Sequence, residues 1–411
     1  MNTTVTINRL GHQGDGIADG PVYVPRTLPG EVISGTIAGT KMEDFRIVTP
    51  SDDRVSPPCR HYKACGGCQL QHASDGFVAK WKLQIVQSAL KNVGLEPDFR
   101  PILTSPARSR RRATVAARRT KKGAMVGFHG RASGVITEIT DCQLLDPAIM
   151  AGLSVAETLA IKGASRKAAL AVTISVCAEG LDVSVTDGKA LDGPLQQVLA
   201  QVTQAHGVAR LSWDGETIAM SAPPTQAFGA ARVVPPPGAF LQATSEGEAA
   251  LVAAVCEIAN GAGQVADLFA GCGTFSLPLA QAAEVLAVEE DAQMMQALDQ
   301  GWRGATGLKL VTVAARDLFR RPLLPDELAR FGAVVLDPPR AGAAAQVAEL
   351  AKAQVARIAY VSCNPITFAR DARDLVDAGY KIDWVQVVDQ FRWSAHTELV
   401  ASFTHNSAPE K

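Results

Sequence analysis

Long apolar runs are missing from this 411-residue sequence. No run reaches the roughly 18 consecutive apolar residues that suggest a membrane-spanning helix, so we expect no membrane partner. The first residues, Met-Asn-Thr-Thr-Val-Thr, lack the basic and then apolar pattern of a secretory signal. We therefore expect a cytoplasmic protein, and no obligatory protein partner is evident from the sequence.

Acidic residues are missing from one segment, although the net charge of the whole chain is only −1. A run of one charge is often only a solvated face. This run also contains strand-like apolar stretches, so we expect a folded basic surface that contacts the phosphates of a nucleic acid. Its basic residues are Arg100, Arg108, Arg110, Arg111, Arg112, Arg118, Arg119, Lys121, Lys122 and Arg131.

The chain length predicts two or three domains, and the apolar fraction of 47% is that of a globular protein. Residues 1–55 alternate apolar and polar positions between glycines and prolines, which predicts a small β-barrel. Residues 56–235 mix strands and helices, including a helix over 77–93, and form the expected central domain. Residues 236–411 follow a proline-rich break and form the third domain.

Strands and helices alternate in residues 236–411. The expected strands are nearly continuous apolar runs, as in a sheet that helices cover on both faces. This pattern predicts a doubly wound, Rossmann-like α/β domain that holds the cofactor. The expected strands are 265–269, 285–289, 310–313, 333–337, 358–362, 381–388 and 399–403.

A glycine turn follows the first of these strands. The run Asp-Leu-Phe-Ala-Gly-Cys-Gly begins at Asp267, and its glycines, Gly271 and Gly273, let the backbone approach a ligand. A dinucleotide fingerprint needs a third glycine where this chain has Ser276. NAD is therefore a disfavoured cofactor.

Acidic residues also end the next strands. Glu289 is placed to hold a ribose diol, and Asp317 is placed to accept a hydrogen from an adenine amino group. Together with Asp267 they form the ordered acidic trio of an S-adenosylmethionine-dependent methyltransferase. The fourth strand ends in Asp337-Pro-Pro-Arg340, where rigid prolines present a carboxylate and a cation to a pyrimidine edge and a phosphate.

Cys363 follows the fifth strand within Ser362-Cys-Asn-Pro365 and is the candidate nucleophile. Carbon 5 of uracil is a poor nucleophile, but a thiolate that adds to carbon 6 turns the ring into an enolate that can accept a methyl group. A base must then remove the carbon 5 proton. Glu398 is one candidate for this base, and His396 is the other.

Eight cysteines in a cytoplasmic chain indicate thiol or metal chemistry rather than disulfides. Zinc sites usually pair their ligands in two close doublets. Three clustered thiolates and a remote fourth suit an iron–sulfur cluster better, with zinc as the alternative and a purely structural role open. This set is Cys59, Cys65, Cys68 and Cys142, whereas Cys177, Cys256 and Cys272 are expected to pack as small apolar side chains.

These motifs resemble the RNA 5-methyluridine (uracil-C5) methyltransferase family over nearly the whole chain. Residues 24–31 are similar to the pattern of the family's TRAM domain, an OB-like RNA-binding barrel. Phe240 and Gln242 match the Phe-x-Gln that opens the family's catalytic domain, where the glutamine contacts the cofactor or the target base. The resemblance implies that Cys363 is the nucleophile and Glu398 the proton-abstracting base.

The resemblance also implies a substrate and a second cofactor. The family's ribosomal branch carries a [4Fe-4S] cluster on this cysteine spacing, which implies 23S ribosomal RNA as the substrate. The alternatives are the same chemistry on transfer RNA and a non-enzymatic iron–sulfur RNA-binding protein; a cytosine-5 enzyme would usually show a Pro-Cys context. Two places depart from the family pattern: Thr244 replaces an asparagine, and residues 294–299 lack the usual asparagines.

Overall fold

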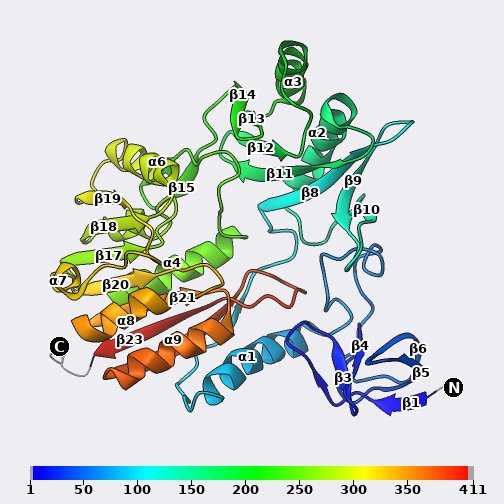
Figure 1. Cartoon of the computed structure of the whole chain (residues 1–411), viewed down its shortest axis with the longest axis horizontal. Coiled ribbons are helices and arrows are strands. Elements are labelled where there is room, and N and C mark those ends of the chain that lie inside the picture. Colours follow the sequence, from blue (N-terminus) through cyan, green and yellow to red (C-terminus); the bar gives the residue numbers. More distant parts are fainter. Residues whose placement is uncertain (1–2, 406–411) are drawn as a thin grey trace.

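The computed structural model describes residues 3–405, with the backbone alone at residue 43. Three large sheets follow one another along this part of the chain (Figure 1). The N-terminal sheet has the strand order β1-β5-β6-β4-β3-β2 and is built from β1 (Thr3–Thr6), β2 (Arg9–Leu10), β3 (Gly16–Ala18), β4 (Val22–Val24), β5 (Val32–Ala38) and β6 (Lys41–Thr49). Ile7, Val24, Ile33 and Met42 form its small apolar core.

The middle sheet has seven strands in the order β10-β9-β8-β11-β12-β13-β14. Its helices α2 and α3 pack beside each other and against the sheet, with Trp213 and Leu159 buried in their shared core. The elements are β8 (Arg112–Arg119), β9 (Ala124–His129), β10 (Ile136–Glu138), α2 (Pro147–Gly163), β11 (Ala169–Cys177), β12 (Gly180–Thr186), α3 (Gly193–His206), β13 (Arg210–Trp213) and β14 (Glu216–Met220). A two-stranded ribbon, β15 (Gln226–Phe228) and β16 (Ala231–Val233), leads to the third sheet.

The third sheet confirms the predicted α/β unit. Its strand order is β19-β18-β17-β20-β21-β23-β22-β7, parallel from β19 to β21 and antiparallel at β23. All the strands expected from the sequence are present, with ends that differ by a few residues: β17 (Gln264–Leu268), β18 (Glu284–Glu289), β19 (Val311–Ala315), β20 (Ala333–Leu336), β21 (Arg357–Ser362), β22 (Tyr380–Asp389) and β23 (Leu399–His405). The chain turns back after β19 and places β20 beside β17. A ligand is therefore expected in the crevice beyond the carboxyl ends of these two strands.

Helices cover both faces of this sheet. Alternate residues of β17 point to opposite sides, so Val265 packs in one core and Leu268 in the other. The first core includes α4 (Ser245–Ala259) and α6 (Ala292–Arg303), and the second includes α8 (Ala344–Ala353) and α9 (Pro365–Asp377). The short helices α5 (Ser276–Leu279) and α7 (Pro325–Leu328) complete the unit.

One predicted helix packs away from the central sheet. The helix α1 (Asp75–Lys91) falls within 56–235, yet its buried Val86 and Leu90 join the core that contains Phe368 of α9. The short strand β7 (Leu103–Thr104) likewise pairs in parallel with β22 at the edge of the third sheet. The apolar stripe of α1 finds its buried surface there, so this part of the chain braces the α/β unit.

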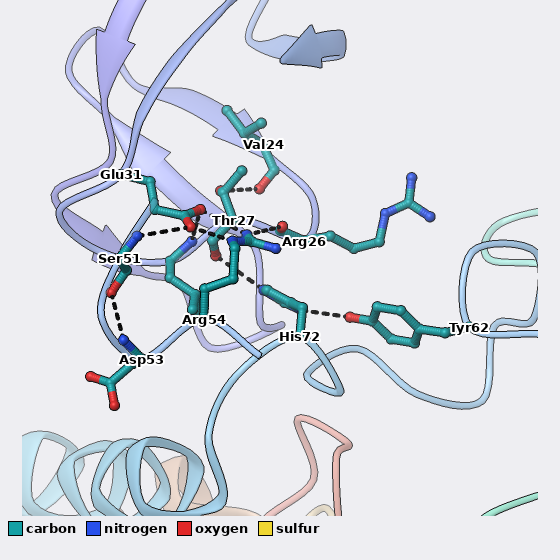
Figure 2. A network of polar contacts seen from close by, with 10 residues as sticks. Val24, Arg26, Thr27, Glu31, Ser51, Asp53, Arg54, Tyr62 and His72 are labelled. Atoms are coloured by element: carbon teal, nitrogen blue, oxygen red, sulfur yellow. Dashed lines mark hydrogen bonds and ion pairs between the residues drawn. The ribbon is translucent and has the colours of Figure 1, made fainter. Parts of the chain in front are cut away.

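A polar network ties the N-terminal sheet to the segment that holds the clustered cysteines (Figure 2). The buried Glu31 carboxylate accepts a hydrogen bond from the backbone N–H of Leu28 and pairs with Arg54, whose guanidinium also donates to the Arg26 carbonyl at 2.9 Å. The Tyr62 hydroxyl lies 2.6 Å from the His72 ring. Burial alone would raise the pKa of Glu31, but its bonds to Arg54 and the backbone hold that pKa below the usual value.

Among residues 3–405, no helix combines the length and apolar character that crossing a lipid bilayer requires.

Candidate active site

A cavity of about 880 Å³ opens at the carboxyl ends of the strands around β17 and β20. It meets the middle domain on its other side, where Phe128 and Arg110 contribute to its wall. Six of the nine residues predicted for catalysis or cofactor binding line this one cavity: Gln242, Gly271, Glu289, Asp337, Cys363 and Glu398. The structure therefore brings together the predicted nucleophile, the predicted base and much of the predicted cofactor loop.

Cys363 lies between the end of β21 and the start of α9. The next residue, Asn364, caps that helix, because its side-chain oxygen accepts from the N–H of Ile366 at 3.1 Å. Pro365 then occupies the first turn, where a missing N–H costs nothing. The Ser-Cys-Asn-Pro run therefore stops a strand and starts a helix, and it leaves the half-buried thiol facing the cavity.

The charges around Cys363 oppose its ionisation. Burial raises the pKa of the thiol to about 11, and the nearby carboxyl groups of Glu398 and Asp337 act in the same direction. The Arg340 guanidinium acts against them and lowers this pKa. The thiol is thus protonated at neutral pH in this arrangement of charges.

Glu398 precedes β23 and is only 4% exposed. Burial raises the pKa of its carboxyl group to about 7, and a hydrogen bond from Gln390 acts in the opposite direction. A carboxyl group with this pKa can exchange a proton near neutral pH, as a general base must.

His396, the rival base, also lines the cavity. Its ring packs edge-on against Phe391 at 5.6 Å between centroids. Burial lowers the pKa of the imidazole, and the positive charges of Arg340, Lys82 and Arg110 lower it further. The ring is therefore neutral at neutral pH, and both candidate bases stay beside the cavity.

Gln390 was not singled out from the sequence, yet it connects two residues that were. Its side-chain Nε2 donates to Glu398 Oε2 at 2.9 Å and to Gln242 Oε1 at 2.7 Å. All three side chains are less than 5% exposed. A glutamine at the end of an apolar strand carries no spacing signal, which is why sequence reasoning missed it.

The loop that carries His396 and Glu398 is anchored by an ion pair that is buried completely. Lys82 of α1 donates to Asp389 at 2.5 Å and to the Phe391 carbonyl at 2.9 Å. The carbonyl of Trp393 also accepts from the backbone N–H groups of Gln69 and Leu70, at 2.8 and 2.9 Å. A lysine on the apolar face of a predicted helix was the available sequence signal for this anchor.

At the opposite end of the cavity, the Glu289 carboxylate is held by three backbone N–H donors. Gly271 donates at 3.2 Å, Glu290 at 2.8 Å and Asp291 at 3.2 Å. Phe269 and Phe319 flank this end with ring centroids 5.5 Å apart. Phe269 has a φ of 64°, a strained value for a residue with a side chain, and such strain often accompanies ligand sites.

Three predicted cofactor residues lie outside the cavity wall. Asp267 is fully buried beneath it, accepts a hydrogen bond from Ser276 through Oδ2, and has no partner for Oδ1 among the described residues. Gly273 has a φ of 95°, and a side chain there would approach Leu298 to 2.8 Å. Asp317 caps its own turn by accepting from the N–H of Phe319 at 2.9 Å.

The basic segment is in part internal structure, because several of its arginines contact acidic side chains or backbone carbonyls of the same chain, and its role as a phosphate-binding face stays a prediction. Arg111 pairs with the Glu248 carboxylate and also donates to the Gln242 carbonyl. Arg100 pairs with Glu257 on α4. Arg112 donates to two backbone carbonyls in the segment before α4. These contacts join the middle sheet, and the segment that precedes it in the chain, to the α/β unit.

The four spaced cysteines surround a second, much smaller cavity of about 30 Å³. Burial raises the pKa of Cys68 to about 12, and the charges of Cys142, Cys65 and Cys59 raise it further, so the four thiols lie within electrostatic reach of one another. In the part of the chain that the structure describes, no three His, Cys, Asp or Glu side chains form a ligand group for a metal ion. The iron–sulfur cluster therefore stays a prediction.

Comparisons with known proteins bear on the family of this chain. The sequence model of a family described as tRNA (uracil-5-)-methyltransferase matches residues 235–404. A protein of Caulobacter vibrioides described as an uncharacterized RNA methyltransferase is 45% identical, over 97% of this chain and 99% of its own length. The 23S rRNA (uracil(1939)-C(5))-methyltransferase RlmD of Shewanella piezotolerans is 30% identical, over 97% of this chain and 95% of its own length.

A solved structure shares the fold. The tRNA (uracil-54, C5)-methyltransferase of Pyrococcus abyssi, in complex with S-adenosyl-L-homocysteine, superposes with a TM-score of 0.78 at 23% identity, over 98% of this chain and 99% of that one. The fold is that of an S-adenosylmethionine-dependent methyltransferase. With the family match and the full-length relatives, these findings show that the chain belongs to the RNA uracil-C5 methyltransferase family.

Proposed function

We propose that this protein methylates carbon 5 of a uridine in 23S ribosomal RNA, with Cys363 as the nucleophile and Glu398 as the base. The observation that carries the proposal is that a thiol and a carboxyl group with a pKa of about 7 line one cavity with Glu289 and the glycine loop. The 30% identical 23S rRNA methyltransferase supports the choice of RNA. A uridine reaches such a cavity only when it is splayed out of its stack.

The first step is attack of the Cys363 sulfur on carbon 6 of the uracil, which forms the C–S bond and moves the ring electrons to the carbon 4 oxygen. The Cys363 thiol first gives its proton to solvent in the cavity, and Arg340 favours the thiolate that remains. The opposition from Glu398 and Asp337 falls whenever one of these carboxyl groups is protonated. Burial raises the pKa of both carboxyl groups, and protonation of Asp337 would leave Glu398 charged for the later proton transfer.

S-adenosylmethionine, when bound, supplies a methyl group on a positively charged sulfur, and carbon 5 of the enolate takes that methyl group. The Glu398 carboxylate then accepts the carbon 5 proton. The electrons of that C–H bond re-form the double bond between carbons 5 and 6, and the C–S bond breaks to release Cys363 as a thiolate. The buried position of Glu398 keeps water from competing for this proton transfer.

For the cofactor, we propose that Glu289 holds the ribose and that the backbone at Gly271 approaches the amino-acid part. The aromatic side chains Phe269 and Phe319 supply apolar walls for the adenine. Gln242 and Asp337 line the same cavity. Asp267 and Gly273 act from beneath by shaping the loop, and Asp317 would contact the adenine through Oδ2, since its turn uses only Oδ1.

For the RNA, we propose that the N-terminal sheet is a TRAM-like barrel of residues 1–55 that contacts the strand beside the target base. Residues 56–235 would form the central domain and residues 236–411 the catalytic domain. Arg110, which lines the cavity, and the exposed Lys121 and Lys122 are basic side chains that could contact phosphates. Transfer RNA is the alternative substrate, favoured by the description of the matching family.

We further propose that Cys59, Cys65, Cys68 and Cys142 hold a [4Fe-4S] cluster. The fit rests on their donor chemistry and on the cavity that they share. Four thiolates are the ligand set that would hold such a cluster. Iron and sulfide analysis of anaerobically purified protein, with Cys65→Ser as the control, should give four irons per chain that the variant loses; an iron-free protein would contradict the cluster.

Nucleoside mass spectrometry tests the proposed reaction. Unmodified 23S ribosomal RNA and unmodified transfer RNA are incubated separately with the protein and S-adenosylmethionine, beside a Cys363→Ala control. The proposal predicts 5-methyluridine in ribosomal RNA that is missing with the control. Product in transfer RNA alone would keep the chemistry and overturn the substrate, and no product in both would overturn the activity.

A further inference from the structure

Gln390 sits at the junction of the residues proposed for base binding and for proton removal. It is 3% exposed, and a side chain at Gly247 would collide with it at 2.3 Å, so α4 packs tightly against this amide. The position allows almost no movement of the amide. The side chains that form hydrogen bonds with the Gln390 amide are therefore held in one arrangement.

The contacts of Gln390 define which way its amide faces. Its Oε1 accepts from the backbone N–H of Thr244 at 3.4 Å. Its Nε2 faces two acceptors, Gln242 Oε1 and Glu398 Oε2, at 2.7 and 2.9 Å. Reversing the amide would place an oxygen against the Glu398 carboxylate and leave the Thr244 N–H without an acceptor, so this orientation is favoured.

This arrangement determines what the two neighbours offer to the cavity. Glu398 receives the Gln390 bond on Oε2, and its Oε1 makes no hydrogen bond with any described residue. Gln242 presents Oε1 to Gln390, and its Nε2 makes no hydrogen bond within residues 3–405. The free groups are thus one basic carboxylate oxygen and one N–H donor.

We propose that Gln390 is a positioning residue for methyl transfer, because its amide fixes Glu398 as a hydrogen-bond acceptor and Gln242 as a hydrogen-bond donor toward the base. This inference rests on the proposed function. A uracil ring needs this pair: a proton acceptor for carbon 5 and a donor for a ring carbonyl. The same bond also favours the charged form of Glu398, which is the form that accepts the proton.

Thr244 supports the Gln390 hydrogen bonds from the start of α4. It departs from the asparagine usual in the family, but its hydroxyl still caps α4 by accepting from the N–H of Gly247 at 3.0 Å. Its backbone N–H meanwhile serves Gln390. The substitution therefore keeps the helix start that holds the network in place.

The test is the pH dependence of methylation in Gln390→Met. Methionine is similar in length and volume to glutamine but makes none of its hydrogen bonds. Loss of a bond to a charged carboxylate should move the acid limb of the rate profile up by roughly one pH unit. Since proton removal follows methyl transfer, a covalent protein–RNA complex should also accumulate and persist on a denaturing gel.

The other charged groups near Glu398 come from several elements and are unchanged in this variant, so a shift reports on Gln390. Asp337 after β20 and Cys363 after β21 interact electrostatically with Glu398 itself. Arg340 after β20, Lys82 on α1 and Arg110 before β8 act on His396 of the same loop, and Asp389 on β22 pairs with Lys82. A uniform loss of rate, with the acid limb unmoved and no accumulated complex, would reduce Gln390 to a packing role and overturn the proposal.

Gln390→Glu is the second variant and decides the matter if Gln390→Met fails to fold. It keeps the shape of the side chain but places a second carboxyl group beside Glu398, so the acid limb should move further in the same direction. An unmoved limb would contradict the proposal. If the wild-type protein itself methylates no RNA, the proposed function fails; if it is active and both variants share its pH profile, only the role of Gln390 fails.

Discussion

Replacing Glu398 with glutamine should abolish turnover and yet make the protein more stable at alkaline pH. The pKa of this carboxyl group rises from an ordinary 4.5 to about 7 on folding, because burial disfavours its charge. A group with a raised folded pKa destabilises the native state as pH increases through the range between the two values. At roughly 1.4 kcal/mol per pKa unit, the penalty above pH 7 is about 3 kcal/mol.

In the Glu398→Gln variant, the new amide has the shape of the native carboxyl group and can still accept the Gln390 bond, but it carries no charge. The free energy of unfolding of the variant should therefore exceed that of the wild type by up to about 3 kcal/mol at pH 8, with the advantage gone near pH 4.5. Urea denaturation at both pH values measures this difference. An equal difference in the free energy of unfolding at both pH values would refute the conclusion that burial raises the pKa of Glu398.

Glu31→Gln is a matched control, because Glu31 is also buried but has a lowered pKa. Its carboxylate stabilises the fold above the unfolded pKa, so the glutamine variant should be less stable than the wild type at pH 8. The stabilisation by Glu31 is lost as pH falls through its folded pKa, so this deficit should shrink in acid. The two variants should thus differ from the wild type in opposite directions at pH 8.

Three further changes test other parts of the structure. Lys82→Met leaves the Asp389 carboxylate buried without its partner, so it should lower the free energy of unfolding, measured by urea denaturation, by about 3–5 kcal/mol. The control is Lys91→Met, which removes an exposed ion pair and should leave the free energy of unfolding unchanged. Phe319→Ala removes an apolar wall and should weaken S-adenosylhomocysteine binding about tenfold by calorimetry; unchanged affinity would move the adenine elsewhere. Arg111→Met should lower the melting temperature, and an unchanged melting temperature with weaker RNA binding would restore this arginine to the RNA face.

The chain order of the motifs was enough to predict the α/β unit and six of the residues that line its cavity. Strand ends such as Glu289 and Asp337 meet at one edge because parallel strands place their carboxyl ends together. The strands themselves could be predicted from their apolar runs. Local signals of this kind need no knowledge of distant contacts.

Contacts between distant parts of the chain could not be predicted from the sequence. The pairing of Lys82 with Asp389 spans 307 positions, and the use of Arg111 as an internal brace depends on Glu248, 137 positions away. Sequence reasoning assigned Arg111 to an RNA surface because charge alone does not reveal a buried partner. Gln390 was missed for the same reason, since its role comes from the two side chains that it joins.

The central claim is a covalent bond between Cys363 and carbon 6 of the target uridine. RNA that carries 5-fluorouridine at the methylated position tests it most directly, because the base cannot remove fluorine as it removes a proton. We expect a complex that forms only with S-adenosylmethionine, survives denaturation, and yields a peptide with the methylated fluorouridine attached to Cys363. Attachment at another residue, or 5-methyluridine formation on ordinary RNA with no trapped complex on the fluorinated RNA, would contradict the account.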